Sequence, residues 1–357
     1  MRILHVCADS GIPPDGTKGA SVHFRSLHVA LRQLGVRVVA FVKRMPKGPV
    51  PEVPDVRPIA ELASSIVPGD VILERYALGQ HAVLDIARAA GVPHLLEVNA
   101  PLVDEASRHR PDTVKPEDRD IEHAVWRGTD VVLAVSRPLL ERIAVHRSGP
   151  IDIVRNGFDP DLLDGPEPAK ETAPTLVFLG HPKPWHGAEA LPKLLAHPAL
   201  VAVGARLLVV GGGPGADALA EAARARGVDG RVTVTGPLPQ REALRMLRTG
   251  HVAVAPYPVD EDFYFCPLKA IESLGAGMPV VSTKQGDLDE IVGDGGLLVP
   301  AGDDDAFAGA CARLLVDDAL RRTAGEAGRR RAYAGMTWKH SAGQVVAAAE
   351  AALRRGS

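Results

Sequence analysis

The sequence predicts an α/β protein made of two doubly wound, parallel-sheet domains, each of the Rossmann-like type. Short apolar runs rich in β-branched residues alternate with amphipathic segments in both halves of the 357-residue chain. That alternation is typical of βαβ units on a parallel sheet. It pauses once, at residues 164–174, and then starts again. Because ligands of such sheets bind beyond the carboxyl ends of the strands, two domains in series predict a substrate cleft between them.

The first domain is expected over residues 1–163. A helix is predicted at 21–35, because apolar residues recur there at helical spacing and Gly35 stands at the end of the run. The strands expected around it read, in chain order, RILHVCA, VRVVAFV, DVILERY, HLLEVNA, DVVLAVS and DIVRNG.

The segment DGPEPAKETAP, residues 164–174, is the expected linker, because it is polar, contains proline and lacks periodicity. The second domain is expected over residues 175–335, with strands TLVFLG, ARLLVVGGG, RVTVTG, HVAVAPY, PVVST and GGLLVP. Residues 336–357 form a good helix, which either ends the chain as a plain terminal helix or crosses back to brace the first domain.

Composition excludes several classes of protein. The formal net charge is −3 and acidic and basic residues are interspersed, which argues against a nucleic-acid-binding protein. Cys7, Cys266 and Cys311 have neither metal-ligand spacing nor a disulfide framework. The N-terminal run reads as a buried strand rather than a signal peptide, and no apolar stretch has membrane-spanning length. We therefore expect a cytoplasmic protein. The arginines of residues 321–332 permit membrane contact, but without a matching apolar face a solvated helix is favoured.

Three strand-end loops are candidates for anion binding. The loop at 11–21, GIPPDGTKGAS, is too long for the tight glycine turn of a dinucleotide-binding fingerprint; an anion site before a helix and an ordinary flexible connection fit it equally well. The loop at 180–187, GHPKPWHG, has two histidines but no third metal ligand, so either phosphate contact or a solvated loop is expected. The glycines of VVGGGPGAD, residues 209–217, permit close backbone approach.

The stretch DFYFCPLKAIESLGAG, residues 262–277, carries the strongest signal. Lys269 and Glu272 are one helical turn apart and project to the same side. Burying either charge without a partner costs several kcal/mol, so the two neutralise each other or face a ligand. A lysine near a helix N-terminus suits a diphosphate, and a carboxylate that accepts two hydrogen bonds suits the adjacent hydroxyls of a ribose.

Taken together, these motifs resemble the retaining glycosyltransferases of family 4, which have the two-domain GT-B fold. The resemblance covers essentially the whole chain and rests on the order and spacing of GTKGASVHFRSLHVAL, EVNAPL, VLAVSRPLLERI, IVRNGFDP, GHPKPWHG, VVGGGPG, TVTGPLP, ESLGAGMPVV and QGDLDEIV. The KPWHG and FYFCPLK motifs are similar to those of a subset of that family. The resemblance implies that the second domain binds a nucleotide-diphosphate sugar and the first domain binds the acceptor.

The family pattern assigns roles to individual residues of this chain. Glu272 matches the glutamate that binds the ribose hydroxyls, whereas Tyr264 stands where the family usually carries a glutamate that contacts the donor sugar. The arginine and lysine of the usual diphosphate clamp fall at His181 and His186. Lys269 and Lys183 are the expected replacements for the missing cations.

Further site residues follow from the same resemblance. Asn99 stands where many relatives carry a histidine near the donor sugar, and Asn can still hydrogen-bond a hydroxyl. Lys183, His186, Lys269 and Asn99 are thus the expected catalytic residues. The expected donor-binding residues are Gly19, Ala20, His181, Gly213, Pro214, Gly236, Leu238, Tyr264, Phe265, Cys266, Leu268, Glu272 and Gly286. The resemblance implies neither a cofactor nor a metal.

The function expected from the sequence is transfer of a hexose or N-acetylhexosamine, with retention, from a nucleotide-diphosphate sugar. The donor is expected to be UDP-linked, with GDP as the alternative, and the acceptor to be a hydroxyl of a glycan, a glycolipid or a secondary metabolite. Two other functions stay open: a nucleotide-sugar epimerase or phosphorylase on the same architecture, and a catalytically silent sugar-nucleotide-binding homologue. The sequence predicts no oligomeric state.

Overall fold

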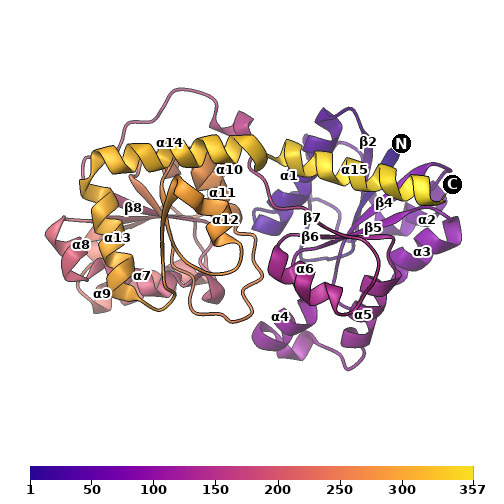
Figure 1. The fold of residues 1–357 in the computed structure, drawn as a ribbon, viewed down its shortest axis with the longest axis horizontal. Coiled ribbons are helices and arrows are strands. Elements are labelled where there is room, and N and C mark those ends of the chain that lie inside the picture. Colours follow the sequence, from indigo (N-terminus) through magenta and orange to yellow (C-terminus); the bar gives the residue numbers. More distant parts are fainter. Residues whose placement is uncertain (357) are drawn as a thin grey trace. The chain divides into compact units, whose positions relative to one another are not determined.

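The computed structural model describes residues 1–356 and divides into two compact units (Figure 1). Unit 1 comprises Met1–Asn156, Tyr264–Cys266 and the chain from Trp338 on. Unit 2 comprises Gly157–Phe263 and Pro267–Thr337. Each unit is built on one parallel sheet, with helices on both sides of it (Figure 1), so the predicted fold class is confirmed.

The sheet of unit 1 has seven strands in the order β3-β2-β1-β4-β5-β6-β7. Its apolar runs are buried on both faces, as a sheet covered on both sides requires. All of its pairings are parallel, so the loops that follow the strands emerge at the carboxyl edge. The strands are β1 (Arg2–Cys7), β2 (Arg37–Val42), β3 (Val56–Pro58), β4 (Asp70–Arg75), β5 (His94–Val98), β6 (Val131–Ala134) and β7 (Ile151–Ile153).

The helices of unit 1 follow the apolar periodicity of the sequence. The first helix begins at Gly19, two residues before the predicted start, and its N-cap residue is Lys18. The sixth is capped by Ser136, whose hydroxyl accepts a hydrogen bond from the amide of Leu139. The helices are α1 (Gly19–Gln33), α2 (Leu62–Ser65), α3 (Ala82–Ala90), α4 (Leu102–His109), α5 (Asp118–Gly128) and α6 (Arg137–Ala144).

The C-terminal helix α15 (Trp338–Gly356) packs against α1. The ring of Trp338 meets that of His23 edge-on, with centroids 4.8 Å apart. The hydroxyl of Ser341 donates to the carbonyl of Arg155 at 2.7 Å. Of the two placements open for this segment in the sequence, the structure thus has the one in which the helix is part of the first unit. Residue 357, the last of the predicted segment, lies outside the described residues.

The sheet of unit 2 has six strands in the order β10-β9-β8-β11-β12-β13, again with parallel pairings. Leucine, valine and phenylalanine side chains of its inner strands and surrounding helices form one apolar core. The strands are β8 (Thr175–Leu179), β9 (Arg206–Val210), β10 (Val232–Val234), β11 (Val252–Ala255), β12 (Val280–Thr283) and β13 (Gly296–Val299). The helices are α7 (Leu191–Leu195), α8 (Pro198–Ala202), α9 (Pro214–Ala225), α10 (Gln240–Leu247), α11 (Leu268–Gly275), α12 (Leu288–Val292), α13 (Asp304–Val316) and α14 (Asp318–Gly335).

The division between the units differs from the expected boundary at residue 163, because the chain joins unit 2 at Gly157. Phe158 forms a parallel bridge with Thr337 and lies against the backbone of Gly275, where a Cβ would come within 2.5 Å of the phenyl ring. The carbonyl of Leu163 accepts from Arg248 at 3.0 Å. Residues 157–163, expected as the end of the first domain, are therefore held by the second unit.

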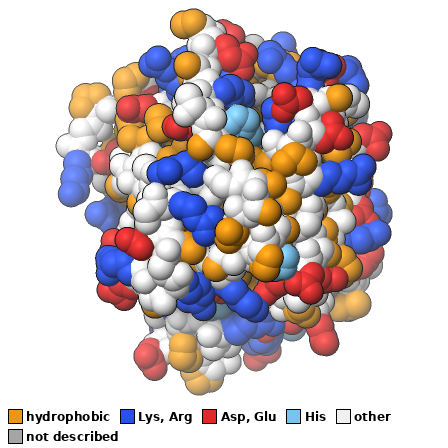
Figure 2. All heavy atoms as spheres, turned by 90° about the vertical axis from the view of Figure 1, so that its left-hand side faces the viewer, with side chains coloured by type: hydrophobic (Ala, Val, Ile, Leu, Met, Phe, Trp, Pro, Cys, Tyr) orange, Lys and Arg blue, Asp and Glu red, His pale blue; other side chains and the backbone are white. Residues whose placement is uncertain are grey.

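The arginines of α14 are engaged locally. Arg321 pairs with Asp318, and Arg331 donates to the carbonyl of Glu290. On the face shown in Figure 2, basic and acidic side chains are interspersed with apolar ones rather than gathered into a single basic patch. Within the part of the chain that the structure describes, no helix is both long and apolar enough to cross a membrane.

Candidate functional site

Glycines bring three loops together at the carboxyl edge of the unit 2 sheet. A Cβ on Gly211, after β9, would lie 2.2 Å from the carbonyl oxygen of Gly180, after β8. A Cβ on Gly212 would lie 3.1 Å from the Cα of Gly236, after β10. Side chains at these positions would push the loops apart. The three loops singled out in the sequence by GHPKPWHG, VVGGGPG and TVTGPLP are thus in backbone contact.

The two histidines of the first of these loops hold backbone rather than a metal. Nδ1 of His181 lies 2.8 Å from the carbonyl of Gly212, and Nδ1 of His186 lies 3.1 Å from the carbonyl of His181. A carbonyl only accepts, so each Nδ1 carries the proton. Burial, together with the nearby charge of Lys269, lowers the pKa of His186 to about 2. Without a bound ligand, His186 is therefore neutral at physiological pH.

Gly187, which follows His186, holds the same loop against β11. Its φ is +65° and a Cβ would lie 1.8 Å from the carbonyl oxygen of Pro256. We expect Gly187→Ala to lower the free energy of unfolding by about 3 kcal/mol or more, since it combines left-handed strain with a backbone clash. Gly204 is the matched control: its φ is +64° with no atom within 4 Å of a Cβ, so Gly204→Ala should cost only about 1 kcal/mol. Urea unfolding of both variants measures this, and equal losses would contradict the close contact.

The ammonium of Lys269, at the start of α11, has no hydrogen-bond partner among the described residues. Its Nζ is buried 4.1 Å from the centroid of the Phe178 ring and 5.8 Å from that of Tyr257. Burial lowers the pKa of Lys269 to about 7, against the opposing effect of Glu272. Cation–π contact offsets only part of the cost of desolvating an ammonium. The described residues therefore compensate only part of the cost of burying this ammonium.

Glu272, one turn further along α11, is 8% exposed. Its Oε1 accepts a hydrogen bond from Nε2 of Gln240, the first residue of α10, at 2.8 Å. Burial raises the pKa of Glu272 to about 7, although Gln240 and Lys269 both act to lower it. Gln240 was missed in the sequence. The available signal was its place at a helix start directly after the TVTGPLP loop.

Lys269 also connects the KPWHG and FYFCPLK motifs in the structure. Its charge acts on His186, which belongs to the first motif, while its Nζ lies over Phe178 at the end of β8. The ring of Tyr257, after β11, stands edge-on to His186 and also to Phe263. The aromatic residues Phe178 and Tyr257 were not predicted as site residues, because nothing in their local sequence distinguishes them from core aromatics.

The other predicted residues of unit 2 lie on the same loops and helix starts. Lys183 is exposed and precedes a single turn of 3-10 helix, Pro184–His186. Gly213 is the N-cap of α9 and Pro214 its first residue, while Leu268 is the first residue of α11. Leu238 is half-buried between Gly236 and α10. Gly286 has a φ of +49° and lies so close to Phe263 that a Cβ would come within 2.7 Å of the ring.

Tyr264, Phe265 and Cys266, which the sequence predicted as donor-binding residues together with Glu272, group with unit 1. The hydroxyl of Tyr264 donates to Oε2 of Glu105 at 2.7 Å, and its carbonyl accepts from Ser136 at 2.6 Å. The side-chain amide of Asn156 donates to the carbonyl of Cys266 at 2.6 Å. These contacts with residues far away in the sequence explain why the three residues belong to unit 1, although the residues on either side of them belong to unit 2.

Asn99, in unit 1, follows β5 and is partly exposed. Its amide donates to Oε1 of Glu97, which also accepts from Arg75 at 2.9 Å. Nε2 of His23 makes an ionic contact with the same oxygen at 2.7 Å. Burial acts to raise the pKa of Glu97, but His23, Arg75 and Asn99 together hold it well below its usual range. Gly19 and Ala20 lie in the first turn of α1, with Gly19 exposed.

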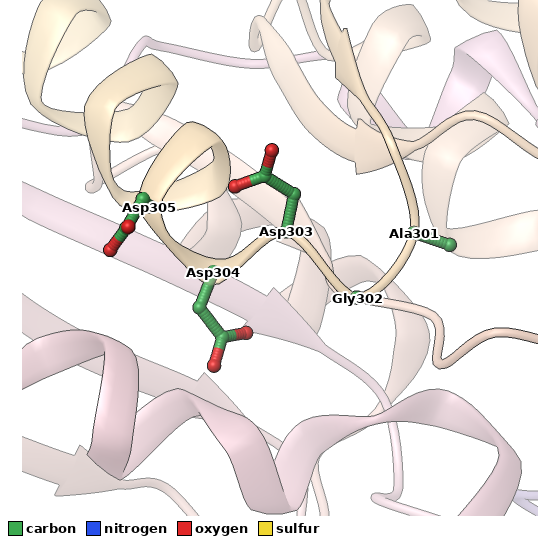
Figure 3. A pocket seen from close by; sticks show the side chains of 5 residues that line it. All are labelled: Ala301, Gly302, Asp303, Asp304 and Asp305. Atoms are coloured by element: carbon green, nitrogen blue, oxygen red, sulfur yellow. The ribbon is translucent and has the colours of Figure 1, made fainter.

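Three consecutive aspartates at the start of α13 line a shallow surface hollow (Figure 3). Asp303 accepts from the amide of Ala306 at 2.8 Å, Asp304 pairs with Lys193 at 2.6 Å, and Asp305 contacts His197 at 3.0 Å. The carboxylates point in different directions (Figure 3). Within residues 1–356 no group of three or more His, Cys, Asp or Glu side chains is arranged to hold a metal.

Comparisons with known proteins decide the family. The family model described as "Glycosyl transferases group 1" matches residues 173–317. A D-inositol 3-phosphate glycosyltransferase of Stackebrandtia nassauensis is 30% identical over 312 residues, which is 80% of this chain and 69% of that protein. The chain belongs to the group 1 glycosyl transferases. This glycosyltransferase is also 29% identical, over 65% of its length and 64% of the relative's, to a GDP-mannose-dependent alpha-(1-6)-phosphatidylinositol monomannoside mannosyltransferase of Mycobacterium tuberculosis.

Solved structures give the same fold. A sucrose-phosphate synthase from Thermosynechococcus elongatus superposes with a TM-score of 0.77 at 20% identity, covering 100% of both chains. Anabaena Alr3699/HepE in complex with UDP and glucose superposes with a TM-score of 0.74 at 15% identity, over 98% of this glycosyltransferase and 100% of that chain. At these identities the likeness establishes the GT-B architecture of the glycosyltransferase and no more.

Proposed function

We propose that this glycosyltransferase transfers a hexose or N-acetylhexosamine from a nucleotide-diphosphate sugar to an acceptor hydroxyl, with retention and without a metal. The observation that supports this proposal most strongly is the buried ammonium of Lys269. It has no hydrogen-bond partner in the described chain and lies one helical turn from Glu272. A diphosphate beside Lys269 supplies the missing anion, and a ribose beside Glu272 supplies hydroxyl donors to its carboxylate.

The loops around this pair suit the same ligand. The close backbone approach of Gly180, Gly211 and Gly212 leaves peptide groups rather than side chains at the edge of the sheet. Gly213 and Pro214 open α9, a helix of 12 residues whose N-terminal dipole favours a phosphate. Fixed donors of this kind stabilise the negative charge that develops on the departing diphosphate.

The proposed glycosyl transfer needs no nucleophile from the protein. The bond between the anomeric carbon and the phosphate oxygen breaks as the acceptor oxygen bonds to the same face of that carbon. The proton of the acceptor hydroxyl passes to the leaving phosphate oxygen. Lys269 then neutralises charge on the diphosphate, and Asn99 holds a hydroxyl of the donor sugar.

The donor and acceptor classes are proposed from the relatives. One relative is named as GDP-mannose-dependent, and the Anabaena neighbour is solved with UDP. We propose UDP as the nucleotide, with GDP as the alternative to be tested beside it. A hydroxyl of a glycan, a glycolipid or a secondary metabolite is the acceptor, and the reaction takes place in the cytoplasm.

A thermal-shift screen of nucleotide sugars, followed by mass spectrometry of the best donor with acceptor pools, tests the proposal. A raised melting temperature with one nucleotide sugar and a product one glycosyl unit heavier are expected. If no nucleotide sugar shifts the melting temperature, the proposal fails. A shift without any product would favour the silent homologue, which the replacement of the usual glutamate by Tyr264 motivates. Conversion of the donor without an acceptor would favour an epimerase.

Glu272→Ala provides a second test, on the nucleotide. The variant should bind UDP about 10- to 100-fold more weakly, since hydrogen bonds to a charged group are lost. In the unmodified protein, UDP should also bind better than its 2′,3′-dideoxy analogue, and this preference should vanish in the variant. Isothermal titration calorimetry measures both. If Glu272→Ala kept the full preference for UDP over the dideoxy analogue, Glu272 would not bind the ribose.

A further inference from the structure

The contact between Asn99 and Glu97 constrains what Asn99 presents to a ligand. Glu97 is 2% exposed, at the carboxyl end of β5, and its Oε1 collects hydrogen-bond or ionic contacts from Asn99, Arg75 and His23. Arg75 and His23 both act to lower the pKa of Glu97 and so favour the ionised carboxylate, which can only accept hydrogen bonds. The end of the Asn99 side chain that touches Glu97 must therefore be its NH2 group.

The carbonyl oxygen of Asn99 is consequently turned away from Glu97, on the side chain that is partly exposed. The surroundings of Glu97 are fixed by further contacts. Nδ1 of His23 lies 2.6 Å from Oδ1 of Asn156, whose own amide donates to the carbonyl of Cys266. Because that amide is turned to Cys266, Asn156 presents an acceptor to His23, and His23 must donate from Nδ1. The carboxylate, the imidazole and the amide therefore form one ordered chain of hydrogen-bonding groups.

We infer that Glu97 is a positioning residue that turns Asn99 so that Oδ1 accepts a hydrogen bond from a hydroxyl of the donor sugar. The inference rests on the proposed function, in which Asn99 faces that sugar. It requires a side chain at position 99 that donates towards Glu97 and accepts towards the ligand. Asparagine and neutral histidine meet this requirement, and an ionised aspartate does not.

A comparison of Asn99→Asp with Asn99→Ala tests whether position 99 must donate a hydrogen bond to Glu97 or merely make a contact there. Aspartate has almost the shape of asparagine but places a second carboxylate against Glu97. At pH 8 we expect Asn99→Asp to have a kcat about tenfold below that of Asn99→Ala, with Asn99→His within about threefold of the unmodified protein. A contact that only fills space predicts the reverse order, with aspartate better than alanine.

The pH dependence of kcat distinguishes this role from a purely structural one, because a purely structural role of Asn99 would not produce the dependence expected here. Two carboxylates in contact share a proton at higher pH than either alone, and the introduced aspartate, once protonated, again donates to Glu97. The charged and titratable groups facing Glu97 are Arg75 from β4, His23 from α1, and His5 and Cys7 from β1. All of these groups are present in both Asn99→Asp and Asn99→Ala, so their effects cancel in the ratio of the two kcat values. Relative to Asn99→Ala, Asn99→Asp should recover about tenfold between pH 8 and pH 5.5.

The double variant Glu97→Gln with Asn99→Asp restores the pair with reversed polarity, because the introduced glutamine amide can donate to the introduced carboxylate. We expect it to exceed Asn99→Asp alone in kcat at pH 8, with melting temperatures recorded as a check on folding. If Asn99→Asp equals Asn99→Ala at every pH and the double variant is no better, the inference is overturned while the proposed function stands. If the unmodified chain turns over no nucleotide sugar, the proposed function fails and the inference with it.

Discussion

Replacing Lys269 with methionine should lower kcat/KM for the donor by about 10²- to 10³-fold, the usual loss when one preorganised donor to a developing anion is removed. Methionine keeps an apolar stem over the ring of Phe178, so the fold should survive; removal of a buried unpaired ammonium should even raise the melting temperature. The loss should appear in binding of UDP and not of uridine, because only the diphosphate meets the ammonium. Calorimetric titration with both ligands measures the difference.

Lys183→Met is the matched control, since Lys183 is an exposed lysine of the neighbouring KPWHG motif. It should cost less than Lys269→Met in both assays. If Lys183→Met has the larger effect, the replacement cation lies on the loop and not on α11. If both variants bind UDP as well as the unmodified protein, the diphosphate lies elsewhere.

The pH dependence of UDP binding follows from the same residue. Burial lowers the pKa of Lys269 to about 7, so above that pH the ligand-free protein holds it neutral and a proton must be taken up when a diphosphate binds. Affinity should therefore fall as pH rises from 7 to 9, by up to about tenfold per unit. Lys269→Met should remove that fall and leave only the opposite effect of Glu272, whose pKa burial raises to about 7. His181 and His186 were the alternative source of such a slope, but His186 is neutral throughout this range because burial lowers its pKa to about 2.

The fold and the position of α11 could be predicted because both depend on local sequence patterns. β-branched runs separated by amphipathic segments define two parallel sheets, and a charged pair beside Pro267 defines the start of α11. The partners of that pair were not predictable. Phe178 and Gln240 reach Lys269 and Glu272 from strand and loop ends more than 30 residues away, through side-chain directions that spacing does not encode.

The limits of local reasoning are clearest at FYFCPLK. Its last residues belong to unit 2, whereas Tyr264, Phe265 and Cys266 belong to unit 1. The hydrogen bonds that decide this come from Ser136 and Asn156, more than 100 residues earlier. The segment looks continuous in sequence, and only the tertiary partners divide it.

Two buried histidines in the core of unit 1 should each lower the free energy of unfolding of this glycosyltransferase as the pH falls below about 6.5. The ring of His5, on β1, stacks on Phe24 with centroids 4.1 Å apart and lies 5.9 Å from the ring of His28, on α1. Neither imidazole has a hydrogen-bond partner among the described residues. Burial lowers the pKa of His28 to about 4, with Arg32 acting in the same direction, and burial also lowers the pKa of His5 well below its usual value.

The sign follows from proton uptake. In the unfolded chain a histidine binds a proton as pH falls through about 6.5, but buried His28 stays neutral down to about pH 4. The unfolded state therefore binds more protons in that window, and the free energy of unfolding falls with pH. A shift of this size corresponds to about 3 kcal/mol for His28 alone. Glu272 and Glu122 act the other way, since burial raises the pKa of each to about 7 and their contributions are lost as pH rises from 4.5 to 7.

Comparison of variants separates the effect of His28 from that of these opposing carboxyl groups. Urea unfolding at pH 7.5 and pH 4.5 should show a smaller acid loss for His28→Leu than for the unmodified protein, by about 2 to 3 kcal/mol. His81→Asn, which alters an exposed histidine paired with Asp85, should leave the acid loss unchanged. Glu272 and Glu122 are present in all three proteins, so their contributions cancel in the differences. An equal acid loss in His28→Leu and the unmodified protein would mean that His28 takes up its proton in the folded state as readily as in the unfolded chain.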